Sequence, residues 1–158
     1  MRGGRGKTSA GGAFEREQAR VSSNDSAARR EVGHAGDGHE VVRHMAETAA
    51  RAAAGMFAED VILIDLRELV SYTDYFVVAS AETDRQARRV VEEVLAKMNE
   101  EGYRPRSRRY DEGSAWISLD YLDVVVHVFT DEARDYYRLE SLWRSAPQEH
   151  WEEQEERS

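Results

Sequence analysis

A strand-like run from Leu119 to Phe129 constrains the fold of this chain more than any other stretch. Its sequence, LDYLDVVVHVF, is almost wholly apolar and rich in β-branched residues. This composition is typical of a strand that is buried on both faces of a sheet. The run nevertheless contains three ionisable residues, Asp120, Asp123 and His127. Because burial of an unpaired charge is costly, each of them needs a partner or a function.

Two other kinds of pattern predict the remaining elements. Apolar residues at helical spacing predict helices from about residue 39 to 55, from 83 or 84 to 102, and from 130 to 143. Short apolar or alternating runs predict strands at 60–66, 74–80, 103–110, 114–120 and 123–129. The proline in the third of these runs favours an edge strand, and the short gap between the last two favours a hairpin. The sequence therefore predicts an α/β fold with a single mixed sheet of about five strands flanked by helices.

The composition predicts one folded domain with a segment on each side. Residues 1–37 hold many glycines and few large apolar side chains, so we expect a disordered N-terminal extension. The folded domain is predicted to span residues 38–147. The charge-rich residues 148–158 follow Pro147 and are predicted to form an acidic C-terminal tail exposed to solvent.

Charge and residue usage exclude several kinds of function. The formal net charge of −9 disfavours non-specific binding to nucleic acid and favours a basic partner surface. The chain has no cysteine, which excludes disulfides, thiolate metal sites and cysteine nucleophiles. No apolar run approaches the roughly 20 residues of a membrane span, and no signal-peptide pattern opens the chain. We therefore expect a protein of the cytosol or of an organelle, with no membrane partner.

The two aspartates near the end of the apolar run permit two different interpretations. Asp120 and Asp123 could hold a divalent cation for nucleotidyl transfer, because such sites use carboxylate oxygens together with substrate phosphates. No third carboxylate is obvious on a neighbouring predicted strand to complete such a site. The structural alternative is that these carboxylates cap a hairpin by accepting bonds from nearby backbone amides. For His127 no nucleophile is in sight, so we expect a histidine bonded to a neighbouring carboxylate or to the backbone.

Trp116 is the most informative aromatic residue in the strand-like segments. Strand alternation puts it on the same face as Ser114, Ser118 and Asp120, which is a mostly polar side. A large aromatic on a polar face favours a binding surface, and the alternative is that Trp116 covers the stem of an adjacent helix. The arginines within residues 104–109 indicate a solvated edge strand, with local contact to RNA as a second possibility.

Three segments together resemble a known family. They read SYTDYFVVASAETDRQARRVVEEV, AWISLDYLDVVVHVF and YYRLESLW, in this order. The chain is similar, from about residue 40 to residue 147, to the ribosomal silencing factor family, which is also called the Iojap family. The resemblance implies a small mixed α/β domain with a nucleotidyltransferase-like fold, and a protein that is not an enzyme and has no catalytic residues, cofactor or metal.

The resemblance also implies a function and partners. Members of this family bind the large ribosomal subunit through a basic ribosomal protein at the intersubunit face. They sterically block association with the small subunit, and so repress translation, and they are often homodimers when free. We expect the same of this chain, in the bacterial cytoplasm or, alternatively, in a mitochondrion or plastid.

By this resemblance, several residues in the matching blocks are expected to bind the partner. These residues are Trp116, Asp120, Asp123 and His127 in the signature block, and Asp74, Tyr75, Asp84 and Arg85 upstream of it. Ala81 and Leu122 stand where the family commonly has glycine, so the turns at these positions are expected to differ from the usual ones. An exposed Leu122 beside Trp116 would enlarge the contact patch.

Overall fold

Six strands form one mixed sheet in the computed structural model, which describes residues 35–111 and 113–151. The strands are β1 (Glu59–Asp65), β2 (Tyr75–Ala81), β3 (Ser107–Asp111), β4 (Trp116–Asp120), β5 (Val124–Thr130) and β6 (Gln148–His150). Their order in the sheet is β3-β4-β5-β2-β1-β6. Only β2 and β5 run parallel to each other, and the other neighbouring strands are antiparallel. The predicted α/β class and single mixed sheet are confirmed, with one strand more than predicted.

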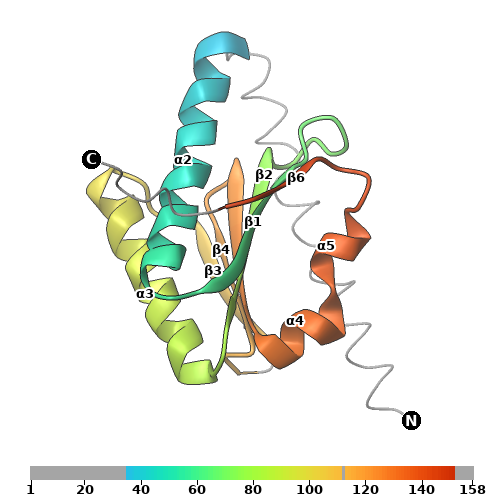
Figure 1. Ribbon diagram of the computed structural model, residues 1–158. Helices are drawn as coiled ribbons and strands as arrows, with labels where there is room; N and C mark the ends of the chain where they lie inside the picture. The colour runs from blue at the N-terminus through green and yellow to red at the C-terminus, as the bar shows by residue number, and fades with distance from the viewer. Residues whose placement is uncertain (1–34, 112, 152–158) are drawn as a thin grey trace, which may run out of the picture.

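Helices cover both faces of this sheet (Figure 1). They are α2 (Ala35–Gly55), α3 (Asp84–Glu100), α4 (Asp131–Tyr137) and the short α5 (Leu139–Leu142). One apolar core lies between α2, α3 and the sheet, and a second lies between α4, α5 and the opposite face. Every residue of β2 and of β5 is buried, which explains why these strands are apolar on both faces. Within the described residues, no helix combines the length and apolarity that crossing a membrane requires.

Side-chain caps and left-handed residues fix where the helices begin and end. The Thr83 hydroxyl accepts a bond of 3.1 Å from the Gln86 amide, and Thr130 likewise caps α4. Gly102, with φ of 92°, follows the end of α3. The last predicted helix is interrupted at Arg138, whose φ of 49° separates α4 from α5. The caps confirm the predicted starts, and the single long final helix was a wrong prediction.

The C-terminal end of the domain differs from the prediction. Residues 148–150 form β6, which pairs with β1 along its outer edge. The Trp151 amide donates a bond of 2.8 Å to the carbonyl of Val61. The guanidinium carbon of Arg51 lies over the Trp151 ring, 5.6 Å from the ring centre. The backbone of residues 148–150 therefore belongs to the sheet, which the predicted tail did not include, while the side chains of these residues are exposed to solvent. The predicted extension at residues 1–37 overlaps the start of α2 at Ala35, and residues 1–34 lie outside the described part.

Candidate binding surface

The residues expected to bind a partner fall into three places in the fold. Asp74, Tyr75, Asp120, Leu122 and Asp123 lie at the end of the sheet where the β4–β5 hairpin turns, whereas Asp84 and Arg85 open α3 at the opposite end, and Trp116 and His127 lie in the interior. The seven residues of β2 separate the two ends by about 20 Å. The predicted residues therefore do not form one contiguous site.

The hairpin turn uses its aspartates internally. The Oδ1 atom of Asp120 accepts a bond of 2.8 Å from the Leu122 amide, and Oδ2 lies 3.4 Å from Nε of Arg106. The carbonyl of Asp123 accepts bonds from the amides of Asp74 and Tyr75 at 2.9 and 3.1 Å. Both aspartates are buried, with exposed fractions of 4% and 7%. Both are therefore too buried to offer a partner an open acidic surface, and the structural alternative, a capped hairpin, holds for Asp120.

The same geometry argues against a metal-dependent enzyme at this position. Both carboxylate oxygens of Asp120 already face a donor within the fold. Among the described residues, no three His, Asp or Glu side chains are grouped so that they could hold a metal ion. With its carboxylate engaged, Asp120 lacks the open coordination positions that a nucleotidyl transfer site needs.

Leu122 adopts the backbone conformation that glycine usually supplies. Its φ is 80°, in the left-handed region, and its side chain is partly exposed. Ala81, by contrast, ends β2 in a buried position and is not among the residues with positive φ. The hairpin thus keeps a left-handed residue despite the leucine, and the turn after β2 does not need one.

We expect Leu122→Gly to stabilise the fold by about 0.5–1 kcal/mol. Glycine removes the left-handed strain of about 1–2 kcal/mol, and part of this gain is offset by the greater entropy of the unfolded chain. Urea unfolding followed by circular dichroism measures the change. Leu122→Ala serves as the control, because alanine trims the side chain but keeps the strain. A lower stability of Leu122→Gly than of Leu122→Ala would contradict this account.

Trp116 is a core residue and not a surface anchor. It is only 3% exposed, and its ring lies 5.0 Å from that of Phe129 and 4.6 Å from that of Tyr137, which belongs to α4. Its Nε1 donates a bond of 3.1 Å to Nδ1 of His127. The prediction of an exposed aromatic on a polar face is therefore wrong. The alternative, that Trp116 covers an adjacent helix, is confirmed.

His127 is a neutral, fully buried histidine. Burial lowers its pKa to about 3, because the charged ring would lose its hydration. The indole of Trp116 donates to Nδ1, so the neutral ring carries its proton on Nε2. The ring of Phe76 packs edge-on at 4.5 Å. The expectation of an ordinary bonded histidine holds in kind, although this partner is an indole and neither a carboxylate nor the backbone.

Tyr75 lies among cationic side chains at the hairpin end of the sheet. The guanidinium groups of Arg43 and Arg67 lie 5.8 and 5.7 Å from the centre of its ring, and His39 stacks on it at 6.4 Å. Tyr75 itself is only 2% exposed, and burial raises the pKa of its hydroxyl. Its ring therefore joins α2 to the sheet and offers little surface to a partner.

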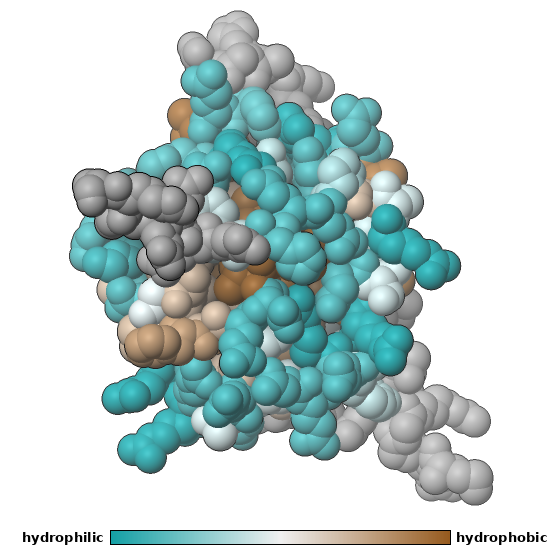
Figure 2. Space-filling model, viewed as in Figure 1, coloured by the Kyte–Doolittle hydropathy of each residue, from teal (hydrophilic) through white to brown (hydrophobic). Residues whose placement is uncertain are grey.

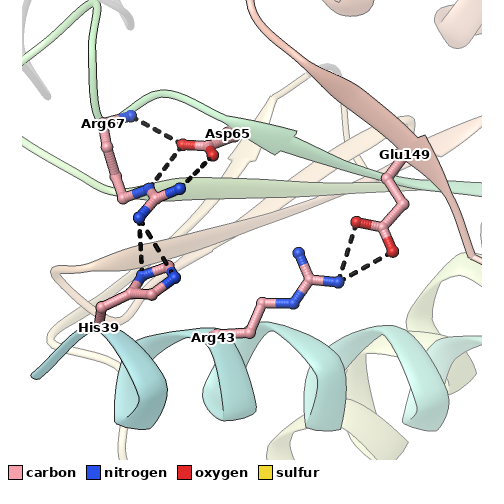
Figure 3. A network of polar contacts seen from close by, with 5 residues as sticks. All are labelled: His39, Arg43, Asp65, Arg67 and Glu149. Atoms are coloured by element: carbon pink, nitrogen blue, oxygen red, sulfur yellow. Dashed lines mark hydrogen bonds and ion pairs between the residues drawn. The ribbon is translucent and has the colours of Figure 1, made fainter. Parts of the chain in front are cut away.

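The two arginines around Tyr75 are held by a polar network (Figure 3). Arg67 contacts Asp65 at 2.6 Å and Nδ1 of His39 at 2.9 Å, and its hydrogen bonds lower the pKa of the Asp65 carboxyl. Arg43 of α2 contacts both carboxylate oxygens of Glu149 in β6 at 2.9 Å. Because Arg43 and Glu149 are 106 positions apart, sequence patterns could not reveal this clamp on β6.

Comparison with known proteins decides the family. A family model described as ribosomal silencing factor during starvation matches residues 39–158. The chain belongs to this family. The ribosomal silencing factor of Bacillus subtilis is 33% identical over 99 residues, a match that covers 63% of this chain and 84% of that protein.

Solved structures support the same assignment. A crystal structure of a protein from Chromobacterium violaceum has a TM-score of 0.63 and 30% identity, and covers 65% of this chain and 86% of that one. A crystal structure from Bacillus halodurans has a TM-score of 0.60 and 27% identity, and covers 69% and 99% respectively. This member of the ribosomal silencing factor family thus shares its sheet and helices with known structures.

Some exposed residues of the chain lie where the sequence predicted them, and one was missed. Arg104, Arg106 and Arg108 are exposed along the edge strand β3 or just before it, as the edge prediction required. Phe57, in the turn between α2 and β1, is 79% exposed and was missed from the sequence. Its signal was a large aromatic directly after the predicted end of the helix at Gly55, where the connection to the next strand is short.

Proposed function

We propose that this chain represses translation by binding the large ribosomal subunit and sterically blocking its association with the small subunit. The observation that carries the proposal is the family match, which extends over residues 39–158. The commitment of both Asp120 oxygens to internal donors supports a protein that acts by binding and not by catalysis. We propose a basic ribosomal protein at the intersubunit face as the main contact.

Charge supports a basic partner. The formal net charge is −9, so a basic protein surface would attract this chain and increase the association rate. Of the residues first expected to make contact, Asp74 and Leu122 at the hairpin end and Asp84 and Arg85 at the start of α3 keep some exposure. We propose that these four can touch a partner. Trp116, Asp120, Asp123, His127 and Tyr75, which are all buried, would act by holding the sheet and the hairpin in shape.

Three further parts of the proposal concern a contact with RNA, the oligomeric state and the compartment. Local contact with ribosomal RNA is proposed for the arginines of the β3 edge, because exposed guanidinium groups bind phosphates well. A homodimer is proposed for the free protein. The bacterial cytoplasm is the proposed compartment, with a mitochondrion or plastid as the alternative.

Co-sedimentation with isolated ribosomal subunits tests the proposed function. We expect the chain to pellet with large subunits and not with small subunits, and to reduce the formation of whole ribosomes when it is in excess. Leu122→Gly is a useful variant here, because it trims the hairpin while keeping the fold. Failure of the chain to pellet with large subunits, or undiminished ribosome formation at saturating protein, would overturn the proposal.

A further inference from the structure

The turn between α2 and β1 exposes an aromatic side chain. Phe57 is 79% exposed, the largest exposed fraction among the large apolar residues that the structure describes. Its φ is 67°, and that of Asp60, at the irregular start of β1, is 50°, so two non-glycine residues close together in the chain lie in the left-handed region. Figure 2 shows a mainly hydrophilic face on which a small apolar patch lies over the end of α2.

This turn is fixed in place and not loosely attached. The amides of Phe57 and Ala58 donate to the carbonyls of Ala54 and Ala53 at 3.0 and 3.1 Å. Gln86 of α3 donates to the carbonyl of Phe57 at 3.1 Å and accepts from the amide of Glu82 at 2.9 Å. The backbone under the phenyl ring is therefore tied to both neighbouring helices, so that presenting the ring requires little ordering when a partner binds.

Four carboxylates lie on the segments next to the Phe57 turn. Glu59 and Asp60 follow Phe57 in the chain, and β1 places Glu59 opposite Ser80 at the end of β2. Glu82 and Asp84 continue from there to the start of α3, joined to the turn through Gln86. All four are exposed, and within residues 35–111 and 113–151 none of them forms an ion pair. The surface is thus an apolar centre flanked mainly by carboxylates, with Arg85 of α3 beside Asp84.

We propose that this surface, Phe57 with the rim of Glu59, Asp60, Glu82 and Asp84, docks on a basic protein surface that has an apolar depression for the phenyl ring. The inference rests on the proposed function, because the basic ribosomal protein invoked there is the partner of this chemistry. Protein–protein interfaces commonly have an aromatic residue at the centre, which contributes much of the binding free energy, and polar or charged residues around it. Asp84 opens α3 beside this surface, so it can touch the same partner as Phe57. It could not do so in a contact centred on the hairpin end of the sheet.

Other occupants fit this surface less well. An RNA strand or an anionic membrane would bring phosphates against four carboxylates. A second copy of the chain, related by a two-fold axis, would bring two acidic rims together, and like charges in such a contact are unfavourable. Neither form of charge repulsion arises with a basic protein.

The residue type at this left-handed position supports a role outside the fold. A left-handed phenylalanine is unfavourable, and a ring that is 79% exposed returns little packing energy to the folded chain. The conformation itself closes α2, through the bonds from the amides of Ala58 and Phe57 to the carbonyls of Ala53 and Ala54, and a glycine or asparagine would supply it at lower cost. The choice of phenylalanine at this position is therefore what a partner would explain. Asparagine tolerates the left-handed region better, so Phe57→Asn separates the two effects.

Phe57→Asn should leave the melting temperature equal to or above that of the wild type, while its affinity for purified bacterial large ribosomal subunits falls at least tenfold. The matched control is Val41→Asn, which likewise replaces an exposed apolar side chain with asparagine, but on α2 and far from the Phe57 turn. It lies 14 residues before Gly55, or roughly 21 Å along the helix, and should bind as the wild type does. A second variant, Asp60→Asn, keeps the turn but removes one charge, and should weaken binding several-fold with a smaller dependence on salt.

The outcomes separate this inference from the proposed function. If the wild type binds large subunits and Phe57→Asn binds equally well, this surface is not the contact and only the inference fails. If Phe57→Asn changes the oligomeric state of the free chain but not its binding to subunits, the surface belongs to self-association and the inference is again wrong. If the wild type itself does not bind large subunits, the proposed function fails and the inference falls with it.

Discussion

Replacing Trp116 with alanine is expected to lower the free energy of unfolding by about 4 kcal/mol. The indole is almost fully buried against Phe129 and Tyr137, so that its removal leaves a large cavity under α4. The substitution also removes the N–H that donates to Nδ1 of His127, and an unsatisfied buried acceptor adds to the loss. Guanidinium unfolding followed by circular dichroism measures the change.

The phenylalanine variant separates the two contributions. Trp116→Phe keeps most of the ring contacts and loses the N–H donor, so we expect it to cost about 1–2 kcal/mol. Loss of large-subunit binding by Trp116→Ala then reflects unfolding and not a missing contact. If Trp116→Ala were as stable as the wild type but failed to bind subunits, Trp116 would have to reach the partner directly, and the buried position would be contradicted.

Most of the fold could be predicted because its elements are strongly periodic. The apolar stripes of α2 and α3 and the β-branched runs of β1, β2 and β5 each indicate their own structure. Strand β6 could not be found in this way. Its three residues all expose their side chains, so the strand has no alternation. Backbone pairing with β1 and the bond between Arg43 and Glu149 hold it, and both depend on residues that are distant in sequence.

The exposure of the candidate site residues was harder to predict than the fold. Alternation correctly put Trp116, Ser118 and Asp120 on one face of β4, but the polar members of that face were taken as a sign of exposure. All three are buried: Trp116 packs against Tyr137 of α4, and Asp120 accepts the Leu122 amide and faces Arg106 in the hairpin. The position of α4 depends on how the chain returns after β5, which the sequence of β4 does not encode. Burial of a polar strand face is therefore decided by tertiary packing.

His127 gives the second large prediction, a loss of stability in mild acid. The unfolded histidine binds a proton below its ordinary pKa of about 6.5, whereas the native ring stays neutral down to a pKa of about 3. Between these two values the unfolded state holds one proton more than the native state. Stability therefore falls as the pH falls through this window, by about 1.4 kcal/mol per pH unit from this residue alone.

The contribution of His127 can be isolated with a residue that does not titrate. His127→Asn can still accept the indole N–H through its amide oxygen, so we expect a modest loss of about 1–2 kcal/mol at pH 7.5. Between pH 4 and 6 its stability should depend less steeply on pH than that of the wild type, by about 1.4 kcal/mol per unit. Urea unfolding at half-unit pH steps measures both slopes. Parallel slopes for the two proteins would show that the native ring accepts a proton in this range, which a fully buried neutral imidazole that accepts the indole N–H cannot do.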